Sequence, residues 1–487
     1  MDINVGLSSF TLVGLADKAV SEAKERVSSA LKNTGIKPPT RENRKVTVNL
    51  APADIKKAGS QFDVAIALGY LLASDQIKKF DTRDKIFVGE LALDGAIRPI
   101  PGALNICSMA AIKGYAQIFI PGSNISEVAN FSGIDIYPVK SLRQLIEHLE
   151  GKEKIIPLYP EEFIPQKSDQ RVDISEIKGQ EAAKRALSIA AAGGHNIFMS
   201  GPPGAGKTML AQALISILPD ISFEEALEAT QVYSAAGMLF GKSFLSSRPF
   251  RAPHHSASLV SVVGGGANPK PGEISLAHRG VLFMDELPEF HRDVLESLRQ
   301  PLESGTVTIT RAKNSVIFPS KFMLVAASNP CPCGYYQDEE KECHCSASDI
   351  LRYQKKLSGP LLDRIDIHIW VNRLKSSDLK KQPNPSESEE IKKQISIARE
   401  IQKNRFKKNA IKAYSNSELS SKQIDEIINL TDSAKKFLEN ALDKAYVSAR
   451  GYFKVLKVAQ TIADMEQKEV VDESALSEAF SYRTRIS

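Results

Sequence analysis

The segment Gly201–Thr208 follows the pattern G-x-x-x-x-G-K-[ST], whose residue types suit the binding of nucleotide phosphates. Glycines let the backbone curl so that its N–H groups and the positive end of a following helix face an anion. Lys207 would reach the β- and γ-phosphates of ATP, and the hydroxyl of Thr208 would bind Mg²⁺. A plain glycine-rich turn is the alternative, but every fixed position of the pattern matches.

The elements around this loop have the order that such a site needs. Residues 196–200 predict a short buried strand before the loop, and residues 209–218 predict a helix after it. The apolar run 281–284 predicts a second buried strand, which would deliver Asp285 to the Mg²⁺ shell and Glu286 to the attacking water. Strands that end in two carboxylates are common at surface turns, so this motif gains weight only beside the phosphate loop.

Residues 171–374 resemble the core of AAA+ ATPases, because a typical lead-in, Asp173–Gln180 with a helix over 181–192, precedes the loop. Within that resemblance, Asn329 fits the residue that orients the hydrolytic water. Arg364 would reach the γ-phosphate held by a neighbouring subunit. An ion pair of Arg364 with Asp363 or Asp366 in its own chain is the alternative. The residues expected to bind the nucleotide are Gly201, Gly204, Ala205, Gly206, Lys207, Thr208 and Asp285.

The C-terminal residues 391–487 predict three or four amphipathic helices, which would form an all-α lid after the polar, proline-broken connection 375–390. Arg450, at the start of the helix expected over 451–467, would lie over the nucleotide as the lid arginine. Residues 391–487 hold 18 Lys+Arg against 13 Asp+Glu, so they carry the whole net charge of +5. This excess indicates either a solvated helix face or a surface for a polyanion.

The first 165 residues alternate short strand-like and helical runs, which predicts an α+β or α/β domain without a phosphate loop. Segments 48–67 and 94–102 resemble the proteolytic domain of Lon-type proteases. Gln61 stands where that family has its nucleophile, Ser60 beside it has no matching base, and the second segment lacks the family's lysine. We therefore expect a non-catalytic domain that serves docking or assembly.

Two inserts distinguish the ATPase core. The glycine- and proline-rich segment 247–272 predicts a loop over the nucleotide face or into a pore, where Lys270 could contact DNA. Alternation over 305–318 predicts a β-hairpin with Arg311 and Lys313 at its tip, and exposed cations there would suit nucleic-acid phosphates.

Four of the five cysteines lie within the insert 331–345, as two C-x-C pairs: Cys331, Cys333, Cys343 and Cys345. Four thiolates could form a tetrahedral Zn²⁺ site that stabilises an insert too small for its own core. The C-x-C spacing is tighter than the usual C-x-x-C, so free thiols remain the alternative.

Composition is that of a soluble globular protein, with 42% apolar and 25% charged residues. No apolar run approaches the roughly 20 residues that a membrane helix needs. The first residues lack a basic segment followed by a long apolar one, so we expect no secretory signal and a cytoplasmic protein without a membrane partner.

Residues 172–487 resemble the magnesium-chelatase-related AAA+ proteins, and the full arrangement is similar to the ComM/YifB family. The resemblance is carried by three blocks: residues 249–256 (Pro-Phe-Arg-Ala-Pro-His-His-Ser), 272–286 and 358–366. It implies a homohexameric ring with helicase activity, which uses ATP and Mg²⁺ to move DNA branch points in homologous recombination, including that of DNA acquired during competence. The alternatives are the motor of a metal chelatase, or a protein-remodelling chaperone without protease activity of its own.

Overall fold

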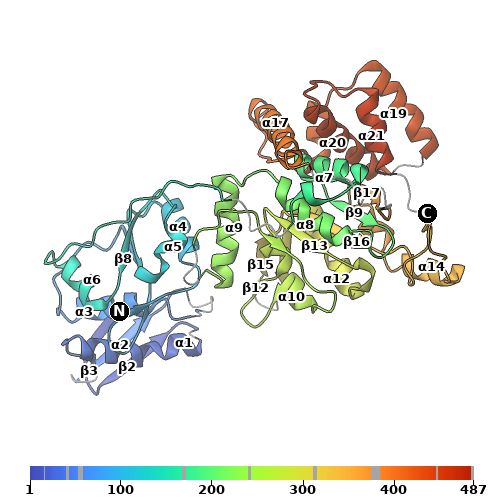
Figure 1. Cartoon of the computed structure of the whole chain (residues 1–487). Helices are drawn as coiled ribbons and strands as arrows, with labels where there is room; N and C mark the ends of the chain where they lie inside the picture. The colour runs from blue at the N-terminus through green and yellow to red at the C-terminus, as the bar shows by residue number, and fades with distance from the viewer. Residues whose placement is uncertain are drawn as a thin grey trace. The chain divides into compact units, whose positions relative to one another are not determined.

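The structure is a computed structural model of the chain. It describes all residues except 16, 40–42, 53–56, 58, 167–171, 240–242, 311–314, 375–383, 446–447 and 484–487. Two compact units are present: Met1–Ile164 with Thr230–Leu245, and Pro165–Ala229 with Ser246–Ser487. Helix α9 (Phe223–Ala236) begins in the second unit and ends in the first (Figure 1). Among the described residues, no helix is long and apolar enough to cross a membrane.

The first unit contains three small sheets with helices. Their orders are β1-β3-β2, β4-β7-β8 and β5-β6, and the second of them is all parallel. The strands are β1 (Asp2–Val5), β2 (Ser9–Val13), β3 (Arg44–Asn49), β4 (Lys85–Phe87), β5 (Glu90–Leu91), β6 (Ile97–Arg98), β7 (Gln117–Pro121) and β8 (Asp135–Val139). The helices are α1 (Lys18–Ser21), α2 (Ala23–Asn33), α3 (Asp63–Ala73), α4 (Ala103–Ile112), α5 (Ile125–Val128) and α6 (Leu142–Leu149).

The apolar segment 86–91, one of the strand-like runs of the first 165 residues, is divided into β4 and β5. Gly89 lies between them, and a Cβ at this position would stand 2.7 Å from Cγ2 of Ile97 and 3.0 Å from Cγ2 of Val64. The chain therefore passes too close to neighbouring side chains for a regular strand of larger residues to continue.

A five-stranded sheet with the order β10-β13-β16-β9-β17 forms the centre of the second unit, and every pair in it is parallel. The unit is therefore mixed α/β with a parallel central sheet, which is consistent with the expected AAA+ P-loop α/β core. The strands of this unit are β9 (Ile197–Ser200), β10 (Phe250–Arg251), β11 (Gly264–Gly265), β12 (Lys270–Pro271), β13 (Val281–Met284), β14 (Thr306–Thr310), β15 (Ser315–Pro319), β16 (Met323–Ser328) and β17 (Ile367–Trp370).

Alternate residues of the central strands face two separate cores, as the twofold period of a strand requires. Ile197 and Met199 belong to one core, and Phe198 belongs to the other. The helices between the strands are α7 (Glu181–Gly193), α8 (Lys207–Ile217), α10 (Leu259–Val263), α11 (Glu273–Leu276), α12 (Arg292–Ser297), α13 (Arg299–Ser304), α14 (Ala347–Gln354) and α15 (Gly359–Leu362). Sheet faces buried on both sides explain why the central strands read as continuous apolar runs.

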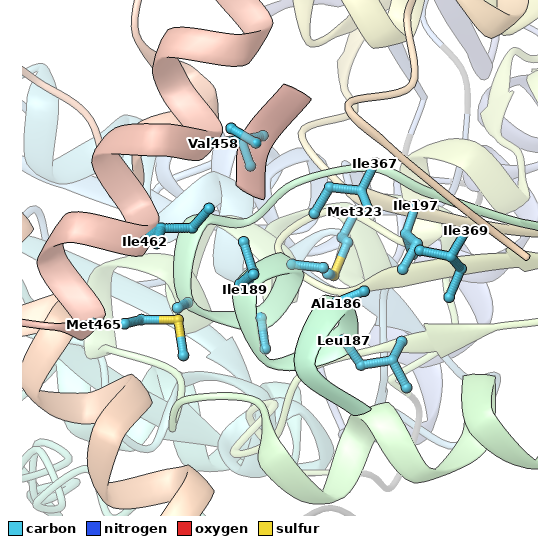
Figure 2. Close-up of a cluster of buried hydrophobic side chains, with 14 of the residues drawn as sticks. Ala186, Leu187, Ile189, Ile197, Met323, Ile367, Ile369, Val458, Ile462 and Met465 are labelled. Atoms are coloured by element: carbon cyan, nitrogen blue, oxygen red, sulfur yellow. The ribbon is translucent and has the colours of Figure 1, made fainter. Parts of the chain in front are cut away.

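The C-terminal helices share a core with one face of this sheet. They are α17 (Glu387–Lys408), α18 (Ser421–Ile427), α19 (Asp432–Ala445), α20 (Ala449–Met465) and α21 (Glu473–Ser481). Figure 2 shows how α7 supplies the contact: Ile189 lies between strand residues such as Ile197 and the α20 residues Val458 and Ile462. The buried layer joins these helices to the sheet.

Two helices begin earlier than expected. Helix α17 begins at Glu387, inside the segment expected to be a connection, and carries Glu387, Glu389 and Glu390 in its first turn. Carboxylates there stabilise the positive end of the helix dipole. Helix α20 begins at Ala449, where the side chain of Ser448 accepts a hydrogen bond from the N–H of Gly451. Arg450 therefore lies within the first turn of α20.

Candidate nucleotide site

The phosphate loop joins β9 to α8 at the carboxyl end of the central sheet. Gly204 and Gly206 have φ angles of +78° and +88°, which side-chain-bearing residues rarely adopt. Gly201 is required for a different reason, because a Cβ there would lie 2.2 Å from the carbonyl oxygen of Val371. The loop backbone, including Ala205, thus turns back toward the start of α8 as the sequence pattern requires.

Lys207 is folded onto the loop that precedes it. Its Nζ donates to the carbonyl oxygens of Gly201 and Pro202, at 2.6 and 3.0 Å, and to Oδ1 of Asn329 at 3.1 Å. Burial lowers the pKa of this amine to about 8, although the nearby carboxylates of Asp285 and Glu286 act in the opposite direction. A phosphate group would replace these neutral acceptors with a stronger, charged partner.

Thr208 and Asp285 meet across the site. The Thr208 hydroxyl donates to Oδ2 of Asp285 at 2.7 Å, so the two predicted Mg²⁺ ligands come together from α8 and the end of β13. Hydroxyl and carboxylate oxygens are the hard donors that Mg²⁺ prefers, so these residues fit the ion. The Asp285 Oδ1 accepts a hydrogen bond from the N–H of Glu286 at 2.9 Å, which fixes the orientation of the carboxylate.

Glu286 projects from a strained turn. Its φ of +50° and ψ of +47° place it in the left-handed region, which is uncommon for residues other than glycine. Its carboxylate is about half exposed and lies 3.4 Å from Nδ1 of His255. His255 was not assigned a role from the sequence, although it lies in one of the blocks that carry the family resemblance.

Asn329 follows β16, the strand adjacent to both β9 and β13. Its amide therefore contacts Lys207 from the neighbouring strand end, 122 residues further along the chain. A cavity of about 530 Å³ opens beside it and is lined by Glu286, Glu289, Asn329, Pro332, Asp349, Arg352, Tyr353 and Lys356. The candidate base Glu286 and the candidate water-orienting amide of Asn329 thus border the same space.

Arg364 lies at the amino ends of the parallel strands, opposite the end that carries the phosphate loop. It precedes β17, which runs parallel to β9 with Ile367 opposite Ile197, whereas the phosphate loop follows the end of β9. Its Nη2 donates to Oε2 of Glu303 at 2.5 Å. Glu303 replaces the partners Asp363 and Asp366 that we weighed from the sequence.

Arg450 contacts the same carboxylate, through Oε1 of Glu303. The expected role of Arg450 as the lid arginine over the nucleotide stays a prediction. Lys454, one turn further along α20, donates to Oδ1 of Asp366 and to the carbonyl oxygen of Arg364, both at 2.6 Å. These contacts hold the start of α20 at the edge where β17 begins, so Arg450 lies beside Arg364 and not beside Lys207.

The four clustered cysteines are close enough to bind one ion. Their sulfur atoms all lie within 4.8 Å of one another, and the Sγ atoms of Cys331, Cys333 and Cys343 are separated by 3.4 to 3.7 Å, with Cys345 completing the set. Four thiolates at this separation fit a tetrahedral Zn²⁺ ion. The turn between the two pairs also touches the phosphate loop, since a Cβ at Gly334 would lie 2.5 Å from Cγ of Pro203.

The predicted DNA-contacting residues are only partly visible. Lys270 is exposed in β12, which pairs with β11 to form a small ribbon after α10. The exposed apolar residues Leu259 and Val260 lie on α10 of the same insert. Arg311 and Lys313 lie outside the described residues, although strands β14 and β15 on either side pair as the expected hairpin.

Comparison with known proteins finds relatives that match nearly the whole chain. Residues 173–379 match the family described as magnesium chelatase, subunit ChlI, and residues 1–124 and 385–483 match two further ChlI families. Competence protein ComM of Haemophilus influenzae is 43% identical over 485 residues, covering 99% of this chain and 93% of the relative. The Escherichia coli protein YifB is 42% identical, covering 99% and 92%. The magnesium-chelatase 38 kDa subunit of Rhodobacter capsulatus is 31% identical over 176 residues, which is 32% of this chain and 49% of that subunit.

Proposed function

Because the chain belongs to the magnesium-chelatase-related ComM/YifB family of AAA+ ATPases, we propose that it is an ATP-driven motor that moves branch points in DNA. The observation that carries the proposal is the meeting of Lys207, Thr208, Asp285 and Asn329 at one edge of the central sheet. Arg364 and Arg450 lie near the amino end of β17, away from the phosphate loop. The phosphate site of a single chain therefore contains only part of the catalytic set.

ATP would bind on the phosphate loop, where the backbone N–H groups and the amine of Lys207 hold its phosphates. Bound through Thr208 and Asp285, Mg²⁺ would neutralise charge that develops on the phosphates. Glu286 would accept a proton from water as the water oxygen attacks the γ-phosphorus and the bond to ADP breaks. Asn329 would orient that water, and the products are ADP and inorganic phosphate.

Arg364 and Arg450 would act on the nucleotide of a neighbouring subunit. Both arginines lie near the amino end of β17, whereas the phosphate loop follows the carboxyl end of β9. This separation within one chain supports the proposal. A closed ring, which we propose to be hexameric, brings the phosphate loop of each copy against Arg364 and Arg450 of the next copy and so completes every site. Guanidinium groups that enter from a neighbour stabilise the charge of the transition state.

The insert that carries Lys270 would contact DNA. The hairpin of β14 and β15 would contact it through Arg311 and Lys313, which lie between these strands in the sequence. The exposed Leu259 and Val260 on the same insert could pack against bases or sugars. We further propose that the C-terminal helices act as the lid of the motor, and that the Cys₄ site binds a structural Zn²⁺. The first unit would serve assembly as a non-catalytic relative of the Lon protease domain.

The test is ATP hydrolysis with and without a synthetic four-way DNA junction, combined with strand-displacement measurement of junction movement. The proposal expects the junction to stimulate hydrolysis, and Glu286→Gln to bind ATP but to lose both hydrolysis and junction movement. Junction movement by the Glu286→Gln variant would reject the motor mechanism. Electron microscopy with a slowly hydrolysed ATP analogue would report the ring.

A second candidate is the motor of a metal chelatase or of a protein-remodelling complex. The likeness to the 38 kDa magnesium-chelatase subunit favours it, although that likeness spans 32% of the chain. In the first unit, the hydroxyl of Ser60 pairs with the carboxylate of Glu90, an acidic partner that offers no basic amine to activate it. ATP-dependent unfolding of a tagged substrate without cleavage, and without any response to DNA, would favour this candidate.

A further inference from the structure

Glu303 contacts both Arg364 and Arg450, the two interface arginines that we propose to act on a neighbouring subunit. Its Oε2 accepts from Nη2 of Arg364 at 2.5 Å, and its Oε1 accepts from Nη2 of Arg450. The three residues come from helix α13, from the turn before β17 and from helix α20, which are 61 and 147 positions apart in sequence. The hydrogen bond from Arg364 lowers the pKa of Glu303, so its side chain is charged at neutral pH.

In this arrangement Arg364 is turned inward. Its side chain is 12% exposed, its Nη1 donates to the carbonyl oxygen of Pro360 at 2.7 Å, and its Nη2 is taken by Glu303. Both terminal nitrogens of the guanidinium, which a phosphate would need, therefore already donate within the chain. A cavity of about 660 Å³ borders Glu303, Arg364 and Arg450, so space for a different arrangement lies beside them.

The ion pairs of Glu303 with Arg364 and Arg450 can be replaced by ion pairs with another anion. The carboxylate of Glu303 is half exposed, and ion pairs in contact with water are weak. A γ-phosphate carries more charge than a carboxylate and offers more acceptor oxygens, so it would compete well for both guanidinium groups. Once they are released, the charge of Glu303 would be repelled by the same phosphate and its helix would tend to move.

Glu303 also stands at the foot of the β14–β15 hairpin. It is the second-to-last residue of α13, and Gly305, with φ of +67°, turns the chain directly into β14. The carbonyl oxygen of Gly305 accepts from the N–H of Ser320 at 2.8 Å, which closes the base of the hairpin. A displacement of the hairpin would therefore be transmitted to the Glu303 carboxylate through two intervening residues.

We infer that Glu303 is a positioning residue that holds Arg364 and Arg450 in a resting state and releases them when the hairpin is displaced. The inference rests on the proposed trans role of the two arginines. It predicts that Glu303 restrains hydrolysis in the absence of DNA, and that the response to DNA depends on it. Glu303 acts only through the two guanidinium groups.

The test compares Glu303→Gln with wild-type protein in ATP hydrolysis, with and without a synthetic four-way DNA junction. We expect hydrolysis without DNA to rise about two- to fivefold, the range that weak exposed pairs allow. We expect the junction to stimulate the variant little further, while KM for ATP stays unchanged. The matched control is Glu296→Gln, since Glu296 pairs with Arg299 near the same helix but contacts neither interface arginine.

The outcomes separate this inference from the proposed function. Unchanged or reduced hydrolysis by a folded Glu303→Gln protein, with its melting temperature retained, overturns the restraint that we assign to Glu303. A fully active Arg364→Ala protein instead overturns the trans mechanism itself. If Arg364→Ala is inactive and Glu303→Gln behaves as wild type, the proposed function stands and only the role of Glu303 is rejected.

Discussion

Nδ1 of His255 lies 3.4 Å from Oε2 of Glu286, and this contact joins the glycine- and proline-rich insert to the candidate catalytic base. The ring of His255 also lies 4.1 Å from the ring of His254 and 6.5 Å from that of Phe290, measured between centroids. The insert continues four residues later into α10, which carries exposed apolar residues. A molecule that contacts the insert could therefore alter the position of the Glu286 carboxylate.

His255→Ala should reduce kcat for ATP hydrolysis roughly tenfold while KM for ATP stays close to its original value, because orientation of the base is lost and phosphate binding is not. His255→Asn, which can still donate a hydrogen bond, should recover part of the loss. Steady-state kinetics measure both. His291→Ala, at an exposed histidine before α12, is the matched control, and an equal loss there would deny a specific role to His255.

Much of the nucleotide site could be predicted from the sequence because its signals are local. The glycines of the loop are required by backbone angles and close contacts at their own positions, and the buried strands show as apolar runs. Glu303 and His255 could not be found in this way. Their partners are distant in sequence, and single acidic or histidine residues between elements carry no periodic pattern.

The same reason explains the position of Arg450. Its helix was expected from amphipathic spacing. The ion pair of Lys454 with Asp366, 88 residues away, holds the start of that helix near the amino end of β17. Tertiary contacts of this kind leave no trace in local spacing. The early start of α17 was missed for a different reason, since its acidic first turn reads as a polar connection until the helix dipole is considered.

Metal binding by the Cys₄ site should be visible in stoichiometry and in nucleotide affinity. We expect about one Zn²⁺ per chain in reduced protein, as a four-thiolate site requires. Cys331→Ser should lose the metal and weaken ATP binding, because the insert packs against Pro203 of the phosphate loop. Elemental analysis and nucleotide titration measure the two effects. Cys107→Ala lies outside the cluster and should keep the metal; metal-free wild-type protein would contradict the site.

ATP binding should take up a proton at alkaline pH through Lys207. Its pKa is lowered to about 8 in the free protein, and bound phosphates would raise it. Below about pH 8 the amine is already charged, so affinity should not depend on it; above that pH, affinity should fall as pH rises. Calorimetry in buffers of different ionisation enthalpy should show little uptake at pH 7 and most of one proton at pH 9. Thr208→Ser keeps the amine and should retain this uptake.

Lys454→Met should destabilise the second unit by about 3 kcal/mol, because it leaves the buried carboxylate of Asp366 without its cation. Burial alone would raise the pKa of Asp366, but Lys454 and His195 lower it, so the stability it contributes is present above the unfolded pKa and is lost as pH falls through the folded one. Fluorescence of the single tryptophan, Trp370 in β17, reports urea unfolding of this unit. Lys468→Ala, which removes surface ion pairs with Glu466 and Asp472, should change the free energy of unfolding much less; an equal loss in both variants would contradict the difference expected from burial.

Mixing two inactive variants should restore hydrolysis if the arginines act between subunits. Lys207→Ala lacks a working phosphate site but keeps Arg364, and Arg364→Ala has the reverse defect. In an equal mixture, about a quarter of the interfaces would pair an intact site with an intact arginine, so turnover should approach that fraction of the wild-type value if the sites act independently.

A second mixture controls for subunit exchange and for partial folding. Arg364→Ala mixed with Arg450→Ala should recover nothing beyond the separate proteins, because both defects lie on the same face and no subunit offers both guanidinium groups to its neighbour. Recovery in this second mixture, or its absence in the first, would mean that the two arginines do not reach one nucleotide together from the adjoining chain.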